Sequence, residues 1–496
     1  MCISLGRNAS DIAEGDAERG TEGAVATAQH PKVLRETCMP PRFREVGNMK
    51  VLLVGNGGRE HAMAAALCRS PQRIQFCSFM GAKNPGIARL ARENGGEFAI
   101  GDIHKPDLVA NWAKSKGIDY AVIGPDAVLA AGVTDALEAA GIKCASPLKE
   151  AARLEWDKTF ARNLMRKYSV RGIPEFAVFE EAAGAAKFID ELGKPVAIKP
   201  AGLTGGKGVK VVGAQLKDNN EAKRYCEELI RAAHGGLPSV VVEERLEGEE
   251  FTLQAFSDGK TLAGMPAVQD HKRAFEGDLG PNTGGMGSYS DANGLLPFMV
   301  QKDYDAGLSI MKETIDAFSK ETGQLFKGVL YGQFMLTKDG PMVIEFNARF
   351  GDPEAMNVLV LLESDFAEIM VKSVDGTLSA SDAKFEKSAT VCKYLVPKGY
   401  PDSPAKDEPV LMDEVEIEGA GAHLFCASVN ESDDGAIYTS SSRTAGIVGV
   451  SDTIEEAEKV AEYACQFVSG EVFHRKDIGT KALIQKRIDH MKRIRG

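Results

Sequence analysis

The sequence MKVLLVGNGGREHA, residues 49–62, joins a short apolar run to a glycine-rich turn and then to the start of a helix. The run Lys50–Val54 is typical of a buried strand, and the Ala-, Met- and Leu-rich stretch Glu60–Cys68 is typical of a helix. Further elements follow in the same alternation, with strands predicted at Ile74–Phe79 and Tyr120–Ile123 and helices at Lys105–Lys116 and Val133–Ala140. Strands that alternate with helices predict a doubly wound parallel sheet over residues 49–150.

The composition describes a multidomain globular protein. The chain has 496 residues, of which 44% are hydrophobic and 26% charged, and this length predicts about three domains. A net charge of −12 argues against a nucleic-acid partner, because phosphate contacts need clustered Lys and Arg. No apolar run approaches the ~18 residues of a membrane span, so no membrane partner is expected. Nine cysteines without a Cys-x-x-Cys favour a reducing, cytoplasmic location.

Three further segments complete the predicted organisation. Residues 1–48 carry no sustained apolar period, and we expect them to form a disordered extension. Residues 151–375 form a second block, which begins with a helix predicted at Leu154–Tyr168. Predicted strands follow at Pro195–Lys199, Val240–Glu244, Leu330–Leu336 and Met342–Phe346. After about residue 376 the composition shifts, and strands at Thr390–Val396 and His423–Ala427 predict a third, α+β domain over residues 376–496.

Several of the 52 glycines gather at three places, and the first is the turn Gly55-Asn56-Gly57-Gly58-Arg59-Glu60. Backbone N–H groups at such a strand-to-helix turn bind anions, with the helix dipole behind them. A dinucleotide site is disfavoured because Glu60 stands where a small residue is needed, and because Ser78-Phe79-Met80 supplies no acid after the second strand. The turn therefore favours a phosphate, with a ligand-free tight turn as the alternative.

The second glycine cluster follows Lys199 and runs through Gly202, Gly205, Gly206 and Gly208. It is not a Walker A loop, because Ala201 and Gly208 replace the required Gly and Ser/Thr. A lysine that ends a strand, followed by a flexible loop with a second lysine, Lys207, is what covering a polyphosphate demands. The alternative is a mobile surface hairpin.

The third cluster, GPNTGGMG at residues 280–287, follows QDHKR at residues 269–273. Two loops rich in hydrogen-bond donors and close in sequence predict a substrate cradle. A lone histidine such as His271 is more often a solvated loop residue. Its neighbours Asp270 and Lys272, beside the glycine run, favour binding instead.

A predicted strand carries the carboxylate end of the site. Glu345 and Asn347 are two residues apart, so both side chains point to one face. A carboxylate beside an amide oxygen suits Mg²⁺, which takes hard oxygen ligands and shares itself with nucleotide phosphates. Arg349 has the same parity and can hold a carboxylate or phosphate bidentately.

From Met49 onward the chain resembles the glycinamide ribonucleotide synthetase (phosphoribosylamine–glycine ligase) family of the ATP-grasp superfamily, over about nine-tenths of its length. The segments that carry this resemblance lie at residues 54–62, 205–209, 242–250, 269–273, 280–287, 345–354 and 475–479. QDHKR, GPNTGGMG and EFNARFGDPE are specific to the family, whereas the others are partly generic. The resemblance implies a pre-ATP-grasp N-terminal domain, an ATP-grasp domain with a small lid subdomain at about residues 168–245, and a C-terminal α+β domain.

The family reaction ligates glycine to 5-phosphoribosylamine through glycyl phosphate, and it forms glycinamide ribonucleotide, ADP and phosphate in de novo purine (IMP) biosynthesis. The resemblance therefore implies ATP and Mg²⁺ (or Mn²⁺) as cofactors. It also implies small-molecule substrates and a monomer or weak dimer.

Carried onto this sequence, the resemblance implies a role for each matching residue. ATP is expected at Lys158, Lys199, Gly205, Gly206, Lys207, Gly208, Val209, Glu244, Leu246 and Glu250, and the metal at Glu345 and Asn347. The sugar phosphate is expected at Asn56, Gly57, Gly58, Arg59 and Glu60. Glycine and the acyl phosphate are expected at Asp270, His271, Lys272, Asn282, Thr283, Gly284, Gly285, Arg349 and Asp352. The catalytic residues are expected to be Arg349, Lys207 and Asp270.

Three positions depart from the family pattern. The segment Lys83-Asn84-Pro85-Gly86 and Asp126 differ on the phosphoribosylamine side, and Gln333 stands where many ATP-grasp enzymes have an acidic metal ligand. One alternative is another ATP-grasp carboxylate–amine ligase or carboxylase with a different acceptor, against which the blocks at 269–287 argue. A second alternative is a nucleotide sensor without turnover. It would need to have lost metal ligands or the arginine, whereas Glu345, Asn347 and Arg349 are all present.

Overall fold

The computed structural model describes residues 49–204 and 208–496. The expected extension 1–48 and the predicted ATP-binding residues Gly205, Gly206 and Lys207 lie outside the described residues. Among the helices described, none is both long and apolar enough to cross a membrane.

The N-terminal part is a five-stranded parallel sheet in the order β3-β2-β1-β4-β5. Its strands are β1 (Met49–Val54), β2 (Ile74–Met80), β3 (Phe98–Ile100), β4 (Tyr120–Ile123) and β5 (Lys143–Cys144). Its helices are α1 (Gly58–Cys68), α2 (Pro85–Glu93), α3 (Pro106–Lys116), α4 (Asp126–Ala131) and α5 (Val133–Ala139). The strand order reverses direction between β1 and β4, where such sheets bind ligands. The predicted doubly wound parallel sheet is confirmed.

The central part contains two four-stranded antiparallel sheets. The small sheet, in the order β6-β9-β7-β8, comprises β6 (Phe176–Phe179), β7 (Val196–Pro200), β8 (Lys210–Val211) and β9 (Val240–Glu244). The large sheet, in the order β11-β10-β16-β17, comprises β10 (Glu249–Asp258), β11 (Leu262–Gly264), β16 (Lys327–Thr337) and β17 (Gly340–Asn347). The helices of this part are α6 (Arg153–Trp156), α7 (Lys158–Lys167), α8 (Ala182–Leu192), α9 (Asn219–Ala232) and α10 (Gln301–Thr322).

The single helix predicted over Leu154–Tyr168 is wrong in one respect, because the structure breaks it at Asp157. This residue is not helical, with φ −127° and ψ 87°, and its side chain accepts a hydrogen bond from the backbone N–H of Phe160. An aspartate that caps a helix in this way starts a new helix rather than continuing the old one. The break places Lys158 at the first position of α7.

The C-terminal part is built on a sheet in the order β12-β15-β18-β23-β20, with β25 also paired to β18. Its strands are β12 (Gln269–Asp270), β15 (Gly287–Ser290), β18 (Ala389–Pro397), β20 (Ala422–Cys426), β23 (Ala445–Ser451) and β25 (Val472–Phe473). Short pairs flank it: β13 (Arg273–Phe275) with β14 (Leu279–Asn282), β19 (Val410–Met412) with β24 (Val468–Gly470), and β21 (Val429–Glu431) with β22 (Ile437–Thr439). The helices of this part are α11 (Glu354–Val360), α13 (Glu414–Gly419), α14 (Ile454–Cys465) and α15 (Lys481–Arg495), with two short 3₁₀ turns, Glu276–Asp278 and Ala380–Asp382. Helix α12 (Phe366–Asp375) packs instead against β10 and β16 of the large central sheet.

The two loops expected around residues 269–287 are in fact largely strands. Residues 269–270 and 287–290 are β12 and β15, and β15 pairs with β18, about one hundred residues further along the chain. Between them, β13 and β14 form a hairpin. This sheet therefore joins residues on both sides of the expected boundary at 375/376.

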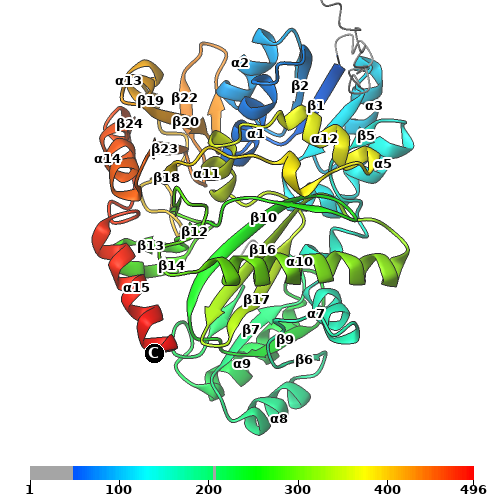
Figure 1. The fold of residues 1–496 in the computed structure, drawn as a ribbon, viewed down its shortest axis with the longest axis vertical. Coiled ribbons are helices and arrows are strands. Elements are labelled where there is room, and N and C mark those ends of the chain that lie inside the picture. Colours follow the sequence, from blue (N-terminus) through cyan, green and yellow to red (C-terminus); the bar gives the residue numbers. More distant parts are fainter. Residues whose placement is uncertain (1–48, 205–207) are drawn as a thin grey trace, which may run out of the picture. The chain divides into compact units, whose positions relative to one another are not determined.

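The cores of the described residues separate the small sheet from the rest. One large apolar cluster runs from the N-terminal sheet through β10 and β16 to β18. The small sheet has a cluster of its own with α8 and α9, and Figure 1 shows these elements together at the bottom of the view. The segment 245–248 links the two, because it connects β9 to β10.

Candidate active site

The turn after β1 is held by its own side chains. Glu60 accepts a hydrogen bond from the Gly57 N–H at 2.6 Å, which caps α1, and its other oxygen pairs with Arg59 Nε at 2.6 Å. Arg59 also donates to the Phe350 carbonyl at 3.1 Å, so the turn reaches the block 345–354. Both side chains are buried. A Cβ added at Gly124, after β4, would lie 2.0 Å from Glu60, so only glycine permits this approach.

The departure at Asn84 ties this turn to the C-terminal part. Its amide donates to the Asn56 carbonyl at 3.0 Å and to the Cys426 carbonyl at 2.8 Å, while its oxygen caps α2. Asn56 in turn accepts from the Gly81 N–H at 3.0 Å. The Asn56 and Asn84 side chains therefore fix the loops around the turn.

The two predicted phosphate-binding lysines lie where the sheets meet. Lys158 donates to the Gly202 carbonyl at 3.2 Å, at the start of the second glycine cluster. Lys199 is buried, donates to the Ile344 carbonyl at 2.7 Å, and pairs with Glu243 at 2.7 Å. Arg162 of α7 binds the other oxygen of Glu243 at 2.6 Å. This buried network connects β7 and β9 of the small sheet to β17, the strand that carries Glu345.

The remaining predicted ATP residues border the same junction. Gly208 is buried, and its carbonyl accepts from the Tyr225 hydroxyl at 2.8 Å, whereas Val209 is half-buried. Glu244 ends β9, and the half-buried Leu246 lies in the link between the sheets. Glu250 is exposed on β10 and accepts from Gln333 at 2.7 Å.

The predicted metal ligands share one end of β17. Glu345 pairs in register with Gln333, and the ladder shifts by one residue immediately beside it. Burial favours the neutral acid, but Lys272, Lys158, Lys199 and Arg349 outweigh it and hold the pKa of Glu345 below its ordinary value, so this carboxylate is charged. Gln333, which stands opposite Glu345, accepts a hydrogen bond from Lys272 at 2.7 Å through its side-chain oxygen.

These residues fit a magnesium ion shared with phosphates. Asn347 Oδ1 accepts from Arg349 at 3.0 Å, which leaves one lone pair of the carbonyl free. Within the described residues no group of three or more His, Cys, Asp or Glu side chains is placed to hold a metal. Mg²⁺ commonly takes one or two protein oxygens plus substrate phosphates, so the Glu345 and Asn347 oxygens meet its requirement.

Arg349 lies beyond the end of β17 rather than on its face, because the strand ends at Asn347. Its guanidinium pairs with Glu155 of α6 at 2.8 Å and lies 3.9 Å from Asp126, the second departure from the family pattern. Burial raises the pKa of Glu155 to about 7 while Arg349 acts to lower it. The arginine is therefore oriented by acids, and its Nε has no hydrogen-bond partner among the described residues.

The QDHKR block contains an acid, Asp270, a cation, Lys272, and a buried histidine, His271. Burial and the neighbouring Glu354 raise the pKa of Asp270 well above its ordinary value, and its buried Oδ1 has no hydrogen-bond partner in the described chain. Lys272 faces Gln333 and Glu250. His271 is 1% exposed, and burial lowers its pKa to about 3, so the ring is neutral and has no surface open to a substrate. The expected binding role of His271 stays a prediction.

The GPNTGGMG block lies against Asp352. Thr283 is buried and donates to the Lys272 carbonyl at 2.9 Å, and Asn282 ends β14. A Cβ at Gly285 would lie 2.7 Å from Asp270 Oδ1, so the glycine run approaches that acid closely. The Gly284 carbonyl accepts a hydrogen bond from Arg443 Nη1 at 2.7 Å, and no sequence motif indicated Arg443.

Asp352 has both carboxylate oxygens engaged by the C-terminal part. Its Oδ1 accepts from the Tyr394 hydroxyl at 2.6 Å, and its Oδ2 pairs with Arg443 at 3.1 Å. Tyr394 and Arg443 are the functional candidates that sequence reasoning missed.

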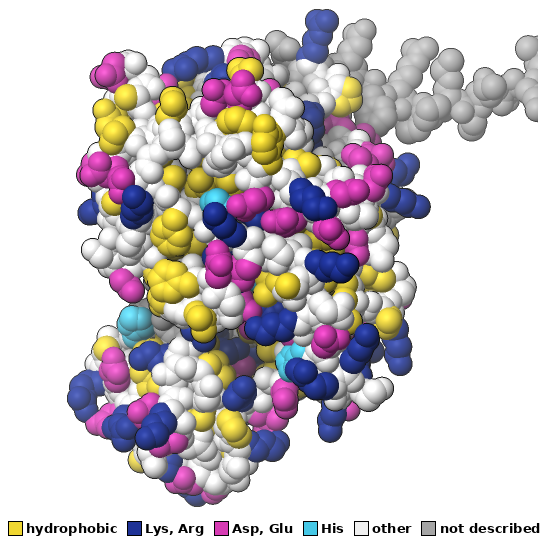
Figure 2. All heavy atoms as spheres, turned by 90° about the vertical axis from the view of Figure 1, so that its left-hand side faces the viewer, with side chains coloured by type: hydrophobic (Ala, Val, Ile, Leu, Met, Phe, Trp, Pro, Cys, Tyr) yellow, Lys and Arg dark blue, Asp and Glu magenta, His cyan; other side chains and the backbone are white. Residues whose placement is uncertain are grey.

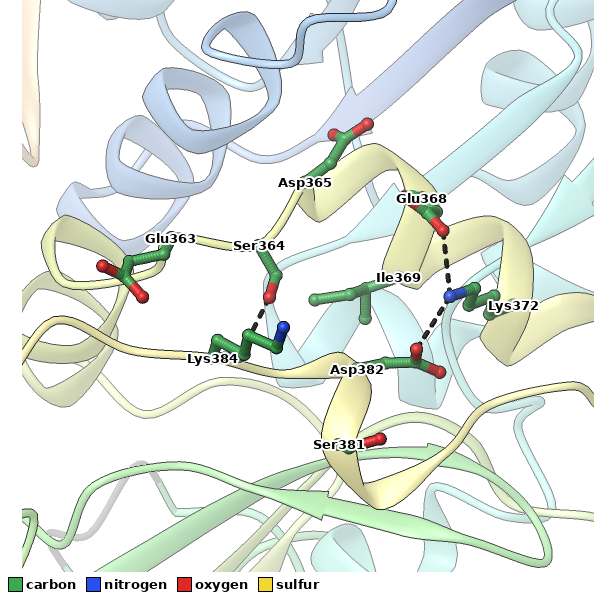
Figure 3. Close-up of a pocket in the computed structure, with 9 residues that line it drawn as sticks. All are labelled: Glu363, Ser364, Asp365, Glu368, Ile369, Lys372, Ser381, Asp382 and Lys384. Atoms are coloured by element: carbon green, nitrogen blue, oxygen red, sulfur yellow. Dashed lines mark hydrogen bonds and ion pairs between the residues drawn. The ribbon is translucent and has the colours of Figure 1, made fainter. Parts of the chain in front are cut away.

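A hollow of about 450 Å³ lies elsewhere, between α12 and residues 381–384 (Figure 3). None of the predicted site residues lines it. Its Lys372 pairs with Glu368 at 2.9 Å and with Asp382 at 2.7 Å, so these charges compensate one another. By contrast, Figure 2 shows a hollow between the lower lobe and the rest of the molecule, with Lys and Arg side chains visible inside it. The converging blocks, rather than the hollow beside α12, form the candidate active site.

Comparisons with known proteins agree with this geometry. Models of the phosphoribosylglycinamide synthetase N domain, ATP-grasp (A) domain and C domain match residues 49–155, 156–355 and 390–481. The chain is 53% identical to the phosphoribosylamine–glycine ligase of Methanosarcina barkeri over 448 residues, which are 90% of this chain and 100% of that protein. It is 51% identical to the enzyme of that name from Methanopyrus kandleri over 452 residues, again 90% of this chain and 100% of that one.

A solved structure has the same fold. The phosphoribosylamine–glycine ligase of Thermotoga maritima superposes with a TM-score of 0.73 at 28% identity, over 86% of this chain and 100% of that one. The resemblance, the three-part architecture and the ATP-grasp core are thus confirmed. The chain belongs to the phosphoribosylglycinamide synthetase family.

Proposed function

We propose that this chain is a ligase that joins glycine to 5-phosphoribosylamine at the expense of ATP, the synthetase step of de novo purine biosynthesis. One observation carries the proposal: the three specific blocks meet in space although they are up to 85 residues apart in the sequence. Asp270 lies beside Gly285, Lys272 binds Gln333 opposite Glu345, and Arg443 joins Gly284 to Asp352. An ATP-grasp enzyme that uses a different acceptor substrate would not require these blocks.

The cations at the sheet junction suit phosphoryl transfer to a carboxylate. Lys158, Lys199 and Lys272 all act on Glu345, and such fixed charges stabilise the charge that develops on a transferring phosphoryl group. Mg²⁺, held by Glu345 and Asn347, supplies further charge neutralisation when bound. We propose that Arg349, whose guanidinium pairs with Glu155, binds the glycine carboxylate.

Asp270 suits the second step, in which the amine of phosphoribosylamine attacks the acyl phosphate and displaces phosphate. The amine must lose a proton as the C–N bond forms. Asp270 Oδ1 has no hydrogen-bond partner among the described residues, so in the ionised carboxylate this oxygen is free to accept a proton. We propose that it takes this proton.

The same proposal includes the finer properties expected from the sequence. We propose domains at 49–150, 151–375 (with a lid subdomain at about 168–245) and 376–496, supported by the separate apolar cluster of the small sheet. We propose a cytoplasmic location, supported by seven free cysteines in the described part of the chain. A monomer or weak dimer is proposed because the exposed large apolar side chains of the described residues are distributed over several elements. Light scattering tests this last property.

The test is ADP release with glycine, freshly prepared phosphoribosylamine, ATP and Mg²⁺. We expect release that requires all four, with glycinamide ribonucleotide detected by mass spectrometry, and the same result for a chain that starts at Met49. Replacing glycine or phosphoribosylamine by other amino acids, bicarbonate or other amines distinguishes an alternative acceptor. No ADP above background with the glycine and phosphoribosylamine pair would refute the assignment.

A further inference from the structure

Arg443 makes an unusual set of contacts for a residue outside every motif. It lies between β22 and β23, and its side chain is 13% exposed. Its Nη1 donates to the carbonyls of Gly284 at 2.7 Å, Gly285 at 3.2 Å and Asp352 at 3.0 Å. Its Nη2 pairs with the Asp352 carboxylate at 3.1 Å. One guanidinium thus holds two segments of the predicted substrate cradle together.

The same group of side chains contacts the predicted sugar-phosphate turn. The Arg443 guanidinium stacks over the Tyr394 ring, 4.4 Å from its centroid, and the Tyr394 hydroxyl donates to Asp352. A Cβ added at Gly58 would lie 2.4 Å from the Tyr394 hydroxyl oxygen, and one at Gly57 would lie 3.9 Å from Asp352 Oδ2. The Asp352 carboxylate therefore lies beside the turn where a phosphate is expected.

This placement creates an electrostatic difficulty that Arg443 relieves. A carboxylate beside an anion-binding turn repels a phosphate unless a cation offsets its charge. Although burial acts to lower the pKa of Arg443, Asp352 and Tyr394 outweigh it and raise that pKa, so the guanidinium is charged. Only arginine combines this charge with a planar fork able to reach the Asp352 carboxylate and three carbonyls at once.

We propose that Arg443 is a positioning residue for phosphoribosylamine, which orders the Gly284–Gly285 segment against Asp352 and cancels the charge of Asp352 beside the sugar-phosphate turn. The proposal rests on the proposed function. It assigns to the C-terminal part of the chain a role in recognising the anionic amine substrate, separate from the ATP side, where Arg443 has no contact among the described residues. Loss of Arg443 should therefore raise the KM for phosphoribosylamine while leaving the KM for ATP near its original value.

The experiment compares R443K, R443Q, D352N, D352N/R443K and D352N/R443Q in steady-state kinetics. We expect R443Q to raise the KM for phosphoribosylamine by at least about 10-fold, and R443K, which keeps the charge but loses the fork, to raise it less. In the D352N background, which has no carboxylate charge to cancel, R443Q should raise that KM by less than about 3-fold. The KM for ATP should change by less than about 2-fold throughout.

The control is R73Q, an exposed arginine for which no ion pair exists among the described residues; its kinetics should match those of the original chain. An equal R443Q effect in both backgrounds, or an unchanged KM for phosphoribosylamine in R443Q and R443K, would overturn the inference. If R443Q does not fold, as judged by circular dichroism, the R443K comparison in the two backgrounds decides. Inactivity of the unaltered chain would instead refute the proposed function, so the two failures are distinguishable.

Discussion

The buried carboxylate of Glu243 offers a direct test of what holds the small sheet to the strand that carries Glu345. Glu243 is 3% exposed and binds Arg162 at 2.6 Å and Lys199 at 2.7 Å. Both cations also bind the backbone of β17. Arg162 donates to the carbonyls of Val343 and Ile344, and Lys199 donates to the carbonyl of Ile344. The substitution E243Q keeps the shape of the side chain and removes its charge.

The expected loss of unfolding free energy in E243Q follows from the two positive charges that remain buried. Removing one partner of a buried ion pair costs about 3–5 kcal/mol, because the other charge loses its compensation. Arg162 keeps two carbonyl acceptors and Lys199 keeps one, so we expect the lower end, about 3 kcal/mol of unfolding free energy. The cost should also depend on pH. Burial, opposed by Glu243, lowers the pKa of Lys199 from 10.5, and the loss of Glu243 lowers it further.

The sign of that dependence is set by the charged lysine. A lysine whose pKa is lower in the folded state destabilises the fold while it is charged, and this cost disappears as the pH rises through the folded pKa toward 10.5. The loss of unfolding free energy caused by E243Q should therefore be larger at pH 7 than at pH 9.5. Urea unfolding followed by circular dichroism at both pH values measures it.

The matched control is E244Q on the same strand. Glu244 pairs with Lys194 at 3.3 Å at the surface, and such pairs contribute less than about 1 kcal/mol. If E243Q cost no more than E244Q, or if its deficit grew with pH, the argument that this network joins the two sheets would be refuted.

Three further predictions concern the site. E345A should abolish ADP release with the circular dichroism spectrum unchanged, because Glu345 is the proposed metal ligand and lies on the partly exposed face of β17; a near-normal rate would contradict the metal role. G58A should lower kcat/KM for phosphoribosylamine by about 10-fold or more, since its Cβ would displace the Tyr394 hydroxyl, whereas G419A, with no atom within 4 Å, should have no effect. EDTA should stop turnover and either Mg²⁺ or Mn²⁺ should restore it, and turnover that persists in EDTA would exclude a metal requirement.

Local sequence pattern predicted the elements whose cause is local. The strand Val240–Glu244 was predicted with the bounds of β9, because three consecutive valines favour a buried strand. The N-terminal sheet was predicted by its alternation of strands and helices. The break at Asp157 was missed, because a helical pattern continues on both sides and only the capping geometry reveals it.

Features that depend on distant partners were not predictable in this way. Residues 269–290 contain short, glycine-rich strands, and their pairing depends on β18, about one hundred residues later. Glu345 and Asn347 were predicted on one face of a strand because their spacing is local, and β17 contains both. Arg443 lies in a Ser-rich turn without a motif, and its partners Gly284 and Asp352 are 159 and 91 residues away. The sequence around Arg443 contains no pattern that predicts these contacts.

The pairing of β15 with β18 also has a consequence for synthesis of the chain. Residue 290 leaves the ribosome about one hundred residues before residue 390, which corresponds to roughly 5–20 s at typical elongation rates. During that interval the edge of β15 has no partner strand, and unpaired edges invite aggregation. Because the glycine run 280–287 adjoins this edge, this part of the predicted site can be completed only after β18 has been synthesised.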